Sequence, residues 1–198
     1  MKRYSDFYTT SFGKEVLERE VLLAANELKG CKKILSIGCG PGFLESRLKQ
    51  LSKAEVIGLE QNPEMLEQAR EKIEVVEGNA EKMRFANNSF DCVLFVTSLE
   101  FISNLKKALA EAARVLSPAG KMLALILNPE SNYFREHTQK KNSYFRKIKH
   151  TNLKEIKKEI EKFFTAEGGY CLGIEGEKVF DSNNRKTAAL YFLRGIKK

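Results

Sequence analysis

Short apolar segments alternate with amphipathic ones between residues 33 and 127, and this alternation limits the possible folds more than any other feature. The apolar segments have the length and composition of buried strands and lie at 33–37, 55–60, 73–76, 90–96 and 121–127. Strands that alternate with helices predict a parallel sheet covered by helices on both faces. Because crossovers between parallel strands are right-handed, a doubly wound sheet is the simplest topology.

The rest of the chain is expected to complete this sheet. Helical spacing of apolar residues predicts helices at 13–29, 42–51 and 105–116, with one more that begins at Pro63 behind Asn62. Beyond residue 128 a basic, partly helical stretch leads into two strand-like segments at 170–174 and 188–193. We expect these two strands to pair antiparallel, which gives an α/β fold of about seven strands with an antiparallel C-terminal hairpin.

A length of 198 residues fits one domain with a full core. We expect a single domain with a helical cover at 1–30, a ligand-binding core at 31–128, and a basic segment with the closing strands at 129–198. No apolar run approaches the ~20 residues of a membrane span, and the start lacks the apolar core of a signal peptide. The sequence therefore predicts a soluble, cytoplasmic protein.

The four cysteines predict neither a metal site nor a redox motif. Cys31, Cys39, Cys92 and Cys171 form no C-x-x-C pair, and with only two histidines no zinc-ligand spacing occurs. Cys39 and Cys92 lie in apolar segments, where a free thiol behaves as a small hydrophobic group. Reduced cysteines in a cytosolic compartment are the expectation.

A glycine-rich turn joins the first strand to the following helix, and Gly38, Gly40 and Gly42 give it the spacing G-x-G-x-G. In a doubly wound sheet, ligands bind at the carboxyl ends of the strands. A dinucleotide site would need a third glycine at position 43, where Phe43 stands, and a P-loop would need Gly-Lys-Ser/Thr. The turn therefore disfavours a pyrophosphate ligand, although it could also be a plain structural turn.

The second strand ends in Glu60, 22 residues after the first glycine of the turn. A carboxylate at this place offers two oxygens to the two adjacent hydroxyls of a ribose. Together with the turn, Glu60 indicates an adenosine-type ligand without a large anion. The alternative is a solvated strand end.

Five segments in order resemble the class I S-adenosylmethionine-dependent methyltransferases, over roughly half of the chain from residue 34 to 128. They lie at 35–42, 56–66, 76–81, 88–93 and 114–121. Within that superfamily the chain is most similar to the small-molecule group typified by quinone-biosynthesis methyltransferases. The resemblance implies a Rossmann-like fold, methyltransferase activity and S-adenosyl-L-methionine as the cofactor.

The resemblance also implies which residues hold the cofactor. The methionine part would lie along Gly38, Cys39, Gly40 and Gly42, the ribose on Glu60, the adenine along Gln61, Asn79 and Ala80, and Thr97 would border the site from the fourth strand. Two positions depart from the family pattern. The family usually has Asp or Glu at position 36 and Asp at position 79, whereas this chain has Ser36 and Asn79. We expect weaker cofactor binding as a result, and Asn79 could instead cap a turn.

Methyl transfer from a sulfonium needs an acceptor aligned in line with the sulfur and the methyl group, and it needs water excluded. No acid or base is obligatory, and the candidates for one are Tyr8, Glu100 and His137. The N-terminal aromatic residues Tyr4, Phe7 and Tyr8 would either fold over the cofactor or pack the first helix onto the domain.

The net charge of +8 arises entirely after residue 120, because residues 1–120 hold 17 basic and 17 acidic residues and residues 121–198 hold 17 and 9. Ten Lys and Arg residues fall within 134–163, interleaved with Phe134, Tyr144 and Phe145. Such a segment could contact RNA, cover an anionic metabolite, or form a solvated helix face with Glu–Lys pairs.

Two signatures of nucleic-acid methylation are absent from the sequence. The segment Thr97–Glu100 stands where an Asn/Asp/Ser-Pro-Pro-aromatic motif would follow the fourth strand, and no Pro-Cys pair occurs. We therefore expect a small-molecule methyl acceptor, anionic if the basic segment binds it. An RNA or tRNA methyltransferase is the first alternative. A catalytically idle module that binds S-adenosylmethionine is the second, because of Ser36 and Asn79.

Overall fold

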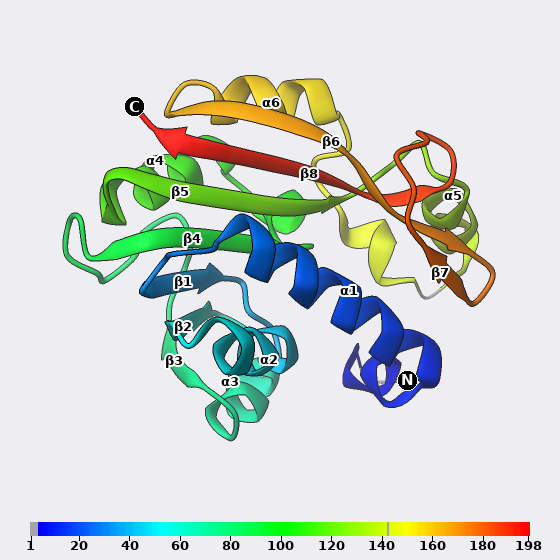
Figure 1. The fold of residues 1–198 in the computed structure, drawn as a ribbon. Coiled ribbons are helices and arrows are strands. Elements are labelled where there is room, and N and C mark those ends of the chain that lie inside the picture. Colours follow the sequence, from blue (N-terminus) through cyan, green and yellow to red (C-terminus); the bar gives the residue numbers. More distant parts are fainter. Residues whose placement is uncertain (1–3, 142) are drawn as a thin grey trace.

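An eight-stranded sheet forms the centre of the computed structural model, which describes residues 4–141 and 143–198 (Figure 1). The strands are β1 (Lys33–Ile37), β2 (Glu55–Glu60), β3 (Glu74–Glu77), β4 (Phe90–Val96), β5 (Leu116–Leu127), β6 (Phe164–Glu175), β7 (Lys178–Phe180) and β8 (Ala188–Lys197). Their order across the sheet is β3-β2-β1-β4-β5-β8-β6-β7. The first five are parallel, and β8 runs antiparallel to both β5 and β6. The predicted α/β fold is confirmed.

Helices cover both faces of the sheet (Figure 1). The α-helices are α1 (Ser11–Glu27), α2 (Phe43–Ser52), α3 (Pro63–Arg70), α4 (Leu105–Val115), α5 (Asn132–Gln139) and α6 (Leu153–Ile160). Three 3-10 helices are η1 (Tyr4–Thr9), η2 (Leu99–Phe101) and η3 (Tyr144–Lys147). The start of α3 matches the prediction, because the Asn62 side chain accepts hydrogen bonds from the N–H groups of Glu64 and Met65.

Alternate residues of the central strands enter two separate cores. In β5, Met122 and Ala124 belong to the core shared with α4 and α6, whereas Leu123 and Leu125 belong to the core shared with α1 and α2. All four side chains are at most 1% exposed. Strands that are buried on both faces read as continuous apolar runs, which is why the sequence shows them clearly.

The structure differs from the prediction in the bounds of several strands and in one strand that the sequence missed. Strand β6 begins at Phe164 rather than residue 170, and β8 extends to Lys197 rather than residue 193. The fifth strand begins at Leu116 rather than residue 121, because Leu116 pairs with Phe90 before a register shift, after which Lys121 pairs with Cys92. The sequence also missed β7, a three-residue strand whose Phe180 packs directly over Gly173 of β6.

The prediction that all cysteines are free thiols is wrong for one pair. Cys31 and Cys92 form a disulfide, with Cα atoms 6.1 Å apart, while Cys39 and Cys171 are free. The pairing arises because β1 and β4 are neighbours in the sheet, so that Ile34 lies opposite Cys92. A separation of 61 residues in the sequence gives no sign of this contact.

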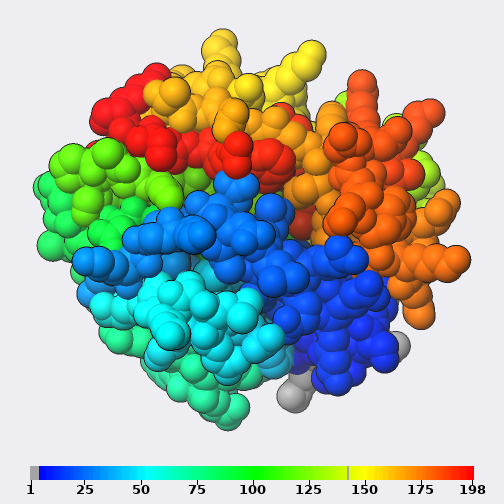
Figure 2. Space-filling model, in the orientation of Figure 1, coloured from blue at the N-terminus to red at the C-terminus, as the bar shows by residue number. Residues whose placement is uncertain are grey.

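One part of the sheet lies open. In Figure 2 the red and orange atoms of β8 and β6 reach the surface beside the blue atoms of α1. Ile196 of β8 is 43% exposed there. Within residues 4–141 and 143–198, no helix has the length and the apolar character needed to cross a membrane.

Candidate cofactor site

The glycine turn after β1 has a backbone that only glycine adopts without strain. Gly38, Gly40 and Gly42 have φ angles of +73°, +56° and +77°. The N–H of Gly38 donates to the carbonyl oxygen of Leu59 at 2.8 Å, which ties the turn to the end of β2. A Cβ atom on Gly38 would lie 2.8 Å from the Cβ atom of Ser98. The turn is therefore fixed at the carboxyl ends of three neighbouring strands.

Glu60 faces this turn from the end of β2 and is only 9% exposed. The backbone N–H of Gly40 donates to Glu60 Oε2 at 2.9 Å. The N–H groups of Gln61 and Asn62 donate to Oε1 at 2.9 and 2.8 Å. These bonds hold the carboxylate in one orientation and occupy three of its roughly four acceptor positions. The remaining acceptor position is on Oε2, beside the turn.

The turn and Glu60 border a pocket of about 120 Å³ at the carboxyl ends of β1, β2 and β4. Its lining comes from Tyr8, Gly38, Cys39, Gly40, Pro41, Phe43, Leu44, Glu45, Glu60, Asn62, Met65, Val96, Thr97 and Tyr144. Two tyrosines from distant parts of the chain narrow it, Tyr8 from η1 and Tyr144 from η3. The Tyr8 ring lies against the Phe43 ring, with centroids 5.2 Å apart.

Residues 35–124, from β1 to β5, match the model of a family described as a methyltransferase domain. This segment contains the glycine turn and Glu60. Over this segment the chain is similar to the class I S-adenosylmethionine-dependent methyltransferases.

Curated relatives of this chain match over part of their length. A ubiquinone/menaquinone biosynthesis C-methyltransferase of Francisella philomiragia is 32% identical over 126 residues, which cover 58% of this chain and 50% of that protein. A malonyl-[acyl-carrier protein] O-methyltransferase of Legionella pneumophila is 34% identical over 107 residues, which cover 50% of this chain and 38% of that protein. The chain thus spans about half the length, or less, of these curated relatives.

Solved structures share the fold of this chain. A methyltransferase of Thermotoga maritima, described as a possible histamine N-methyltransferase, aligns with a TM-score of 0.81 and 24% identity. The alignment covers 98% of this chain and 94% of that one. A methyltransferase of Archaeoglobus fulgidus aligns with a TM-score of 0.78 and 18% identity, covering 98% of both chains. At these identities the likeness shows the fold alone.

The structure brings only some of the expected cofactor residues together. Gly38, Cys39, Gly40, Glu60 and Thr97 line the pocket. Thr97 follows β4 with a φ angle of +42°, and its N–H donates to the Leu125 carbonyl oxygen at 2.7 Å. Burial raises the pKa of the Cys39 thiol, and the Glu45 and Glu60 carboxylates raise it further, so this thiol is a spacer and not a nucleophile.

The other expected cofactor residues lie outside the lining of the pocket. Gly42 begins α2 and packs toward Ala69 of α3 instead. Asn79 is exposed, and its side-chain oxygen accepts a hydrogen bond from the N–H of Glu81 at 2.7 Å. It therefore caps a turn, which was the alternative role expected for it. Gln61 is exposed, and Ala80 packs against the core beside α4.

Of the three candidate acid–base residues, Tyr8 alone lines the pocket. Glu100 is buried, and its Oε1 accepts a hydrogen bond from the N–H of Leu127 at 3.0 Å. Burial raises the pKa of Glu100 to about 7, although the bond from Leu127 acts against this. His137 lies in α5, where its Nδ1 is 2.8 Å from the Tyr133 carbonyl oxygen and its ring stacks on Tyr133. Burial lowers the pKa of His137.

The N-terminal aromatic residues divide between the two expected roles. Tyr8 reaches the pocket, whereas Phe7 packs with Phe12 against the residues around Val16. The side chain of Tyr4 lies outside the described part of the chain.

Sequence reasoning missed three polar residues of the pocket, Glu45, Tyr144 and Asn62, the last of which it placed only as the cap of α3. Glu45 stands in the amphipathic pattern of α2, where a charged residue is usually solvated. Its side chain instead turns inward and is 2% exposed. Tyr144 belongs to the basic segment, which no motif connects to the glycine turn. The one feature of the sequence that could have pointed to Glu45 was Ser36, a neutral residue at a position where the family usually has an acid.

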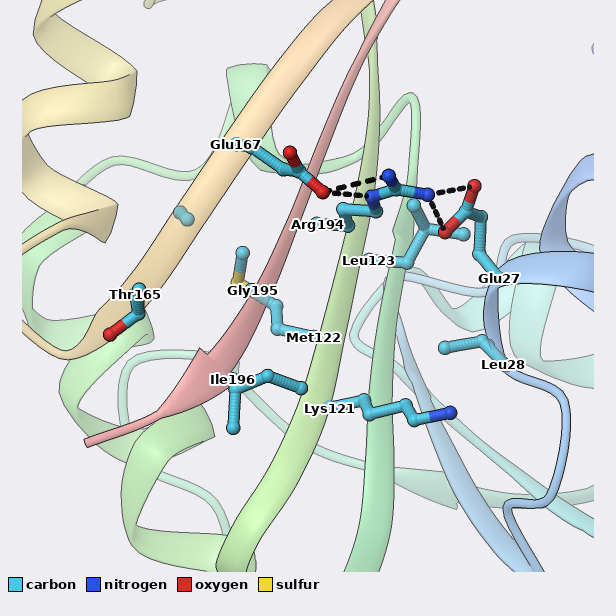
Figure 3. Close-up of a pocket in the computed structure, with 11 residues that line it drawn as sticks. Glu27, Leu28, Lys121, Met122, Leu123, Thr165, Glu167, Arg194, Gly195 and Ile196 are labelled. Atoms are coloured by element: carbon cyan, nitrogen blue, oxygen red, sulfur yellow. Dashed lines mark hydrogen bonds and ion pairs between the residues drawn. The ribbon is translucent and has the colours of Figure 1, made fainter.

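A larger hollow of about 450 Å³ lies elsewhere, between the end of α1 and the starts of β5 and β6 (Figure 3). It lies on the open part of the sheet, at the amino ends of the parallel strands. Figure 3 shows Arg194 of β8 between Glu27 and Glu167, with hydrogen bonds of 2.7–2.8 Å to both carboxylates. The charges of Arg194, Glu27 and Glu167 pair with one another. Since ligands of a doubly wound sheet bind at the carboxyl ends of the strands, the smaller pocket is the candidate site.

Proposed function

We propose that this chain transfers a methyl group from S-adenosylmethionine to a small-molecule acceptor by direct in-line displacement. The observation that carries the proposal is the position of Glu60, whose carboxylate is held by three backbone amides beside the glycine turn. A ribose hydroxyl donates to such a carboxylate, whereas a pyrophosphate would be repelled by it. The residues present therefore fit the cofactor that the family uses.

Each part of the pocket has a definite task in this proposal. The backbone of Gly38 and Gly40 lines the methionine part of the cofactor, and Glu60 orients the ribose. The cofactor supplies an electrophilic methyl group on its sulfonium. Tyr8 and Tyr144 cover the pocket from two sides, which excludes water and holds the acceptor in line. Where an acceptor must lose a proton, the Tyr8 hydroxyl is the candidate group that borders this space.

The basic segment reaches the pocket at one place, η3, and this supports a small and anionic acceptor. Tyr144 of η3 lines the pocket, and Arg146 and Lys147 next to it are exposed. The relatives named above methylate a quinone-pathway compound and a malonyl-[acyl-carrier protein], as their names state, and neither is a nucleic acid. A cytoplasmic location stays a prediction from the sequence, and the Cys31–Cys92 disulfide gives it no support.

Calorimetry with S-adenosylhomocysteine tests this function. We expect saturable binding that is lost in Glu60→Ala and kept in Glu55→Ala, which removes an exposed carboxylate from the start of the same strand. Since Glu60 also bonds three backbone amides, Glu60→Gln serves as a second variant that retains one acceptor oxygen. Absence of binding to the wild-type protein at millimolar ligand would contradict the proposal. Tight binding without turnover across a broad acceptor panel would favour the idle binding module.

A further inference from the structure

Glu45 is a buried acid whose charge the described part of the chain does not balance. It lies in the first turn of α2 and is 2% exposed. Its Oε1 accepts a hydrogen bond of 2.6 Å from the hydroxyl of Ser36, and its Oε2 is buried without a partner. No Lys or Arg side chain of the described residues bonds to it. An unpartnered buried carboxylate is costly, so its retention calls for a ligand or another specific reason.

This carboxylate borders the cofactor pocket. Glu45 contributes to the same lining as Gly38, Gly40 and Glu60, and Ser36 lies two residues before the first glycine of the turn. Burial raises the pKa of Glu45 to about 7, and the Glu60 carboxylate contributes to the rise. A cation bound in the pocket would reverse this effect and keep Glu45 ionised.

An ammonium group is a partner for this carboxylate that needs no further protein ligands. Among the described residues no three His, Cys, Asp or Glu side chains come together in a way that could hold a metal. The partner that the proposed function brings into this pocket carries an ammonium group on its methionine part. An ammonium group donates strong charge-assisted hydrogen bonds to a carboxylate.

We propose that Glu45, positioned by the Ser36 hydroxyl, binds the cationic methionine end of the cofactor. The inference rests on the proposed function and goes beyond it. It assigns the negative charge beside the cofactor to Glu45 of α2, whereas the family usually has an acid at position 36 of β1. In this arrangement the neutral Ser36 positions the Glu45 carboxylate. Its short hydroxyl leaves room for the Glu45 carboxylate and fixes one of its oxygens.

The test compares two ligands that share the nucleoside and differ in the amino-acid part. S-adenosylhomocysteine has the ammonium group, and 5′-methylthioadenosine lacks the whole amino-acid part. We expect Glu45→Gln, which keeps the shape of the side chain, to weaken S-adenosylhomocysteine binding by about 10- to 100-fold, the usual effect of losing a charge-assisted hydrogen bond. Binding of 5′-methylthioadenosine should change less than about twofold. Glu67→Gln, which removes an exposed acid on α3, is the control.

A second-site variant makes the test independent of any damage to the fold. Ser36→Asp combined with Glu45→Gln returns a carboxylate to the strand, and we expect it to recover most of the lost affinity for S-adenosylhomocysteine. Equal weakening of both ligands by Glu45→Gln, or no weakening of either, would overturn the role of Glu45 and leave the proposed function intact. Failure of the wild-type protein to bind either ligand would overturn the proposed function itself, and this inference with it.

Discussion

Three carboxyl groups are buried around the same part of the interior, each on a different element. Glu20 belongs to α1, Glu45 to α2 and Glu100 to η2, and none is more than 6% exposed. Burial raises the pKa of Glu20 to about 8, and the neighbouring Glu45 and Glu100 carboxylates raise it further. Burial raises the pKa of Tyr133 and of Cys171, and the Glu20 carboxylate raises both further.

Glu20 makes the stability of the apo protein depend on pH. Between its ordinary pKa of 4.5 and about 8, the folded state holds a proton that the unfolded state has lost. The free energy of unfolding therefore falls as pH rises through this range, by up to ~1.4 kcal/mol per pH unit. We expect the melting temperature of the wild-type protein to drop between pH 5 and pH 8, and to drop less in Glu20→Gln.

Calorimetric melting at several pH values measures this effect, with Glu15→Gln as the control because Glu15 is an exposed acid on the same helix. Glu45 and Glu100 remain in the Glu20→Gln variant, so part of the pH dependence should persist. The same pH slope in Glu20→Gln and in the wild-type protein would show that Glu20 does not titrate as described.

At the residue scale, the sequence predicted the groups that are tied to a motif. Glycines after a buried strand and an acid at the end of the next strand have fixed places in a doubly wound sheet, so Gly38, Gly40 and Glu60 could be found. Glu45 could not, because its inward position depends on the Ser36 hydroxyl, which is in contact with it only after folding. Asn79 is the reverse case, because the residue that the resemblance places at the adenine is exposed and caps a turn outside the pocket lining.

At the scale of elements, η1 is the segment whose role in the site is easiest to test. It places the Tyr8 ring against Phe43 at the edge of the pocket. If η1 acts as a cover, the ring matters and the hydroxyl does not. We expect Tyr8→Ala to weaken S-adenosylhomocysteine binding by about 2- to 10-fold, in line with the usual energy of an aromatic pair, and Tyr8→Phe to leave the affinity unchanged.

Calorimetry on both variants, with Phe12→Leu as a control for aromatic packing outside the pocket lining, distinguishes the two roles of Tyr8. An equal loss of affinity in Tyr8→Phe and Tyr8→Ala would show that the hydroxyl itself binds the ligand. A full loss of turnover in Tyr8→Phe with unchanged affinity would instead identify Tyr8 as the acid–base group.

The central strands that the sequence predicted are buried on both faces, whereas the features that it missed depend on strand pairing. Strand β4 has a continuous apolar run and could be recognised from composition. Strand β7 has three residues, and its position is set by the contact of Phe180 with Gly173. The start of β5 at Leu116 follows from pairing with Phe90, although Ser117 and Pro118 read as the end of a helix.

At the scale of the whole molecule, the basic residues of the C-terminal part are distributed over different surroundings. Helix α6 packs on the core through Ile156 and Ile160. Two of the salt bridges of this segment are Lys157–Glu161, along α6, and Lys162–Glu159 just after it. This matches the expectation of a solvated helix face with Glu–Lys pairs. Among the described residues of the segment 134–163, Tyr144 of η3, next to Arg146 and Lys147, is the one that lines the pocket.

This distribution of basic residues predicts that the protein binds RNA weakly, and that this binding does not involve the cofactor pocket. In filter binding to bulk tRNA, we expect a dissociation constant of about 10⁻⁴–10⁻⁶ M at physiological salt, steeply weaker at higher salt and unaffected by S-adenosylhomocysteine. Replacing Lys154 and Lys158 by Gln on α6 should lower this binding as much as replacing Arg146 and Lys147 by Gln. An RNA-modifying enzyme would behave differently, because the basic residues next to its pocket must bind the phosphates of the RNA that it modifies. Nanomolar binding that only the Arg146 and Lys147 variant abolishes would therefore contradict a small-molecule acceptor, and it would make η3 the entry point for a nucleic acid.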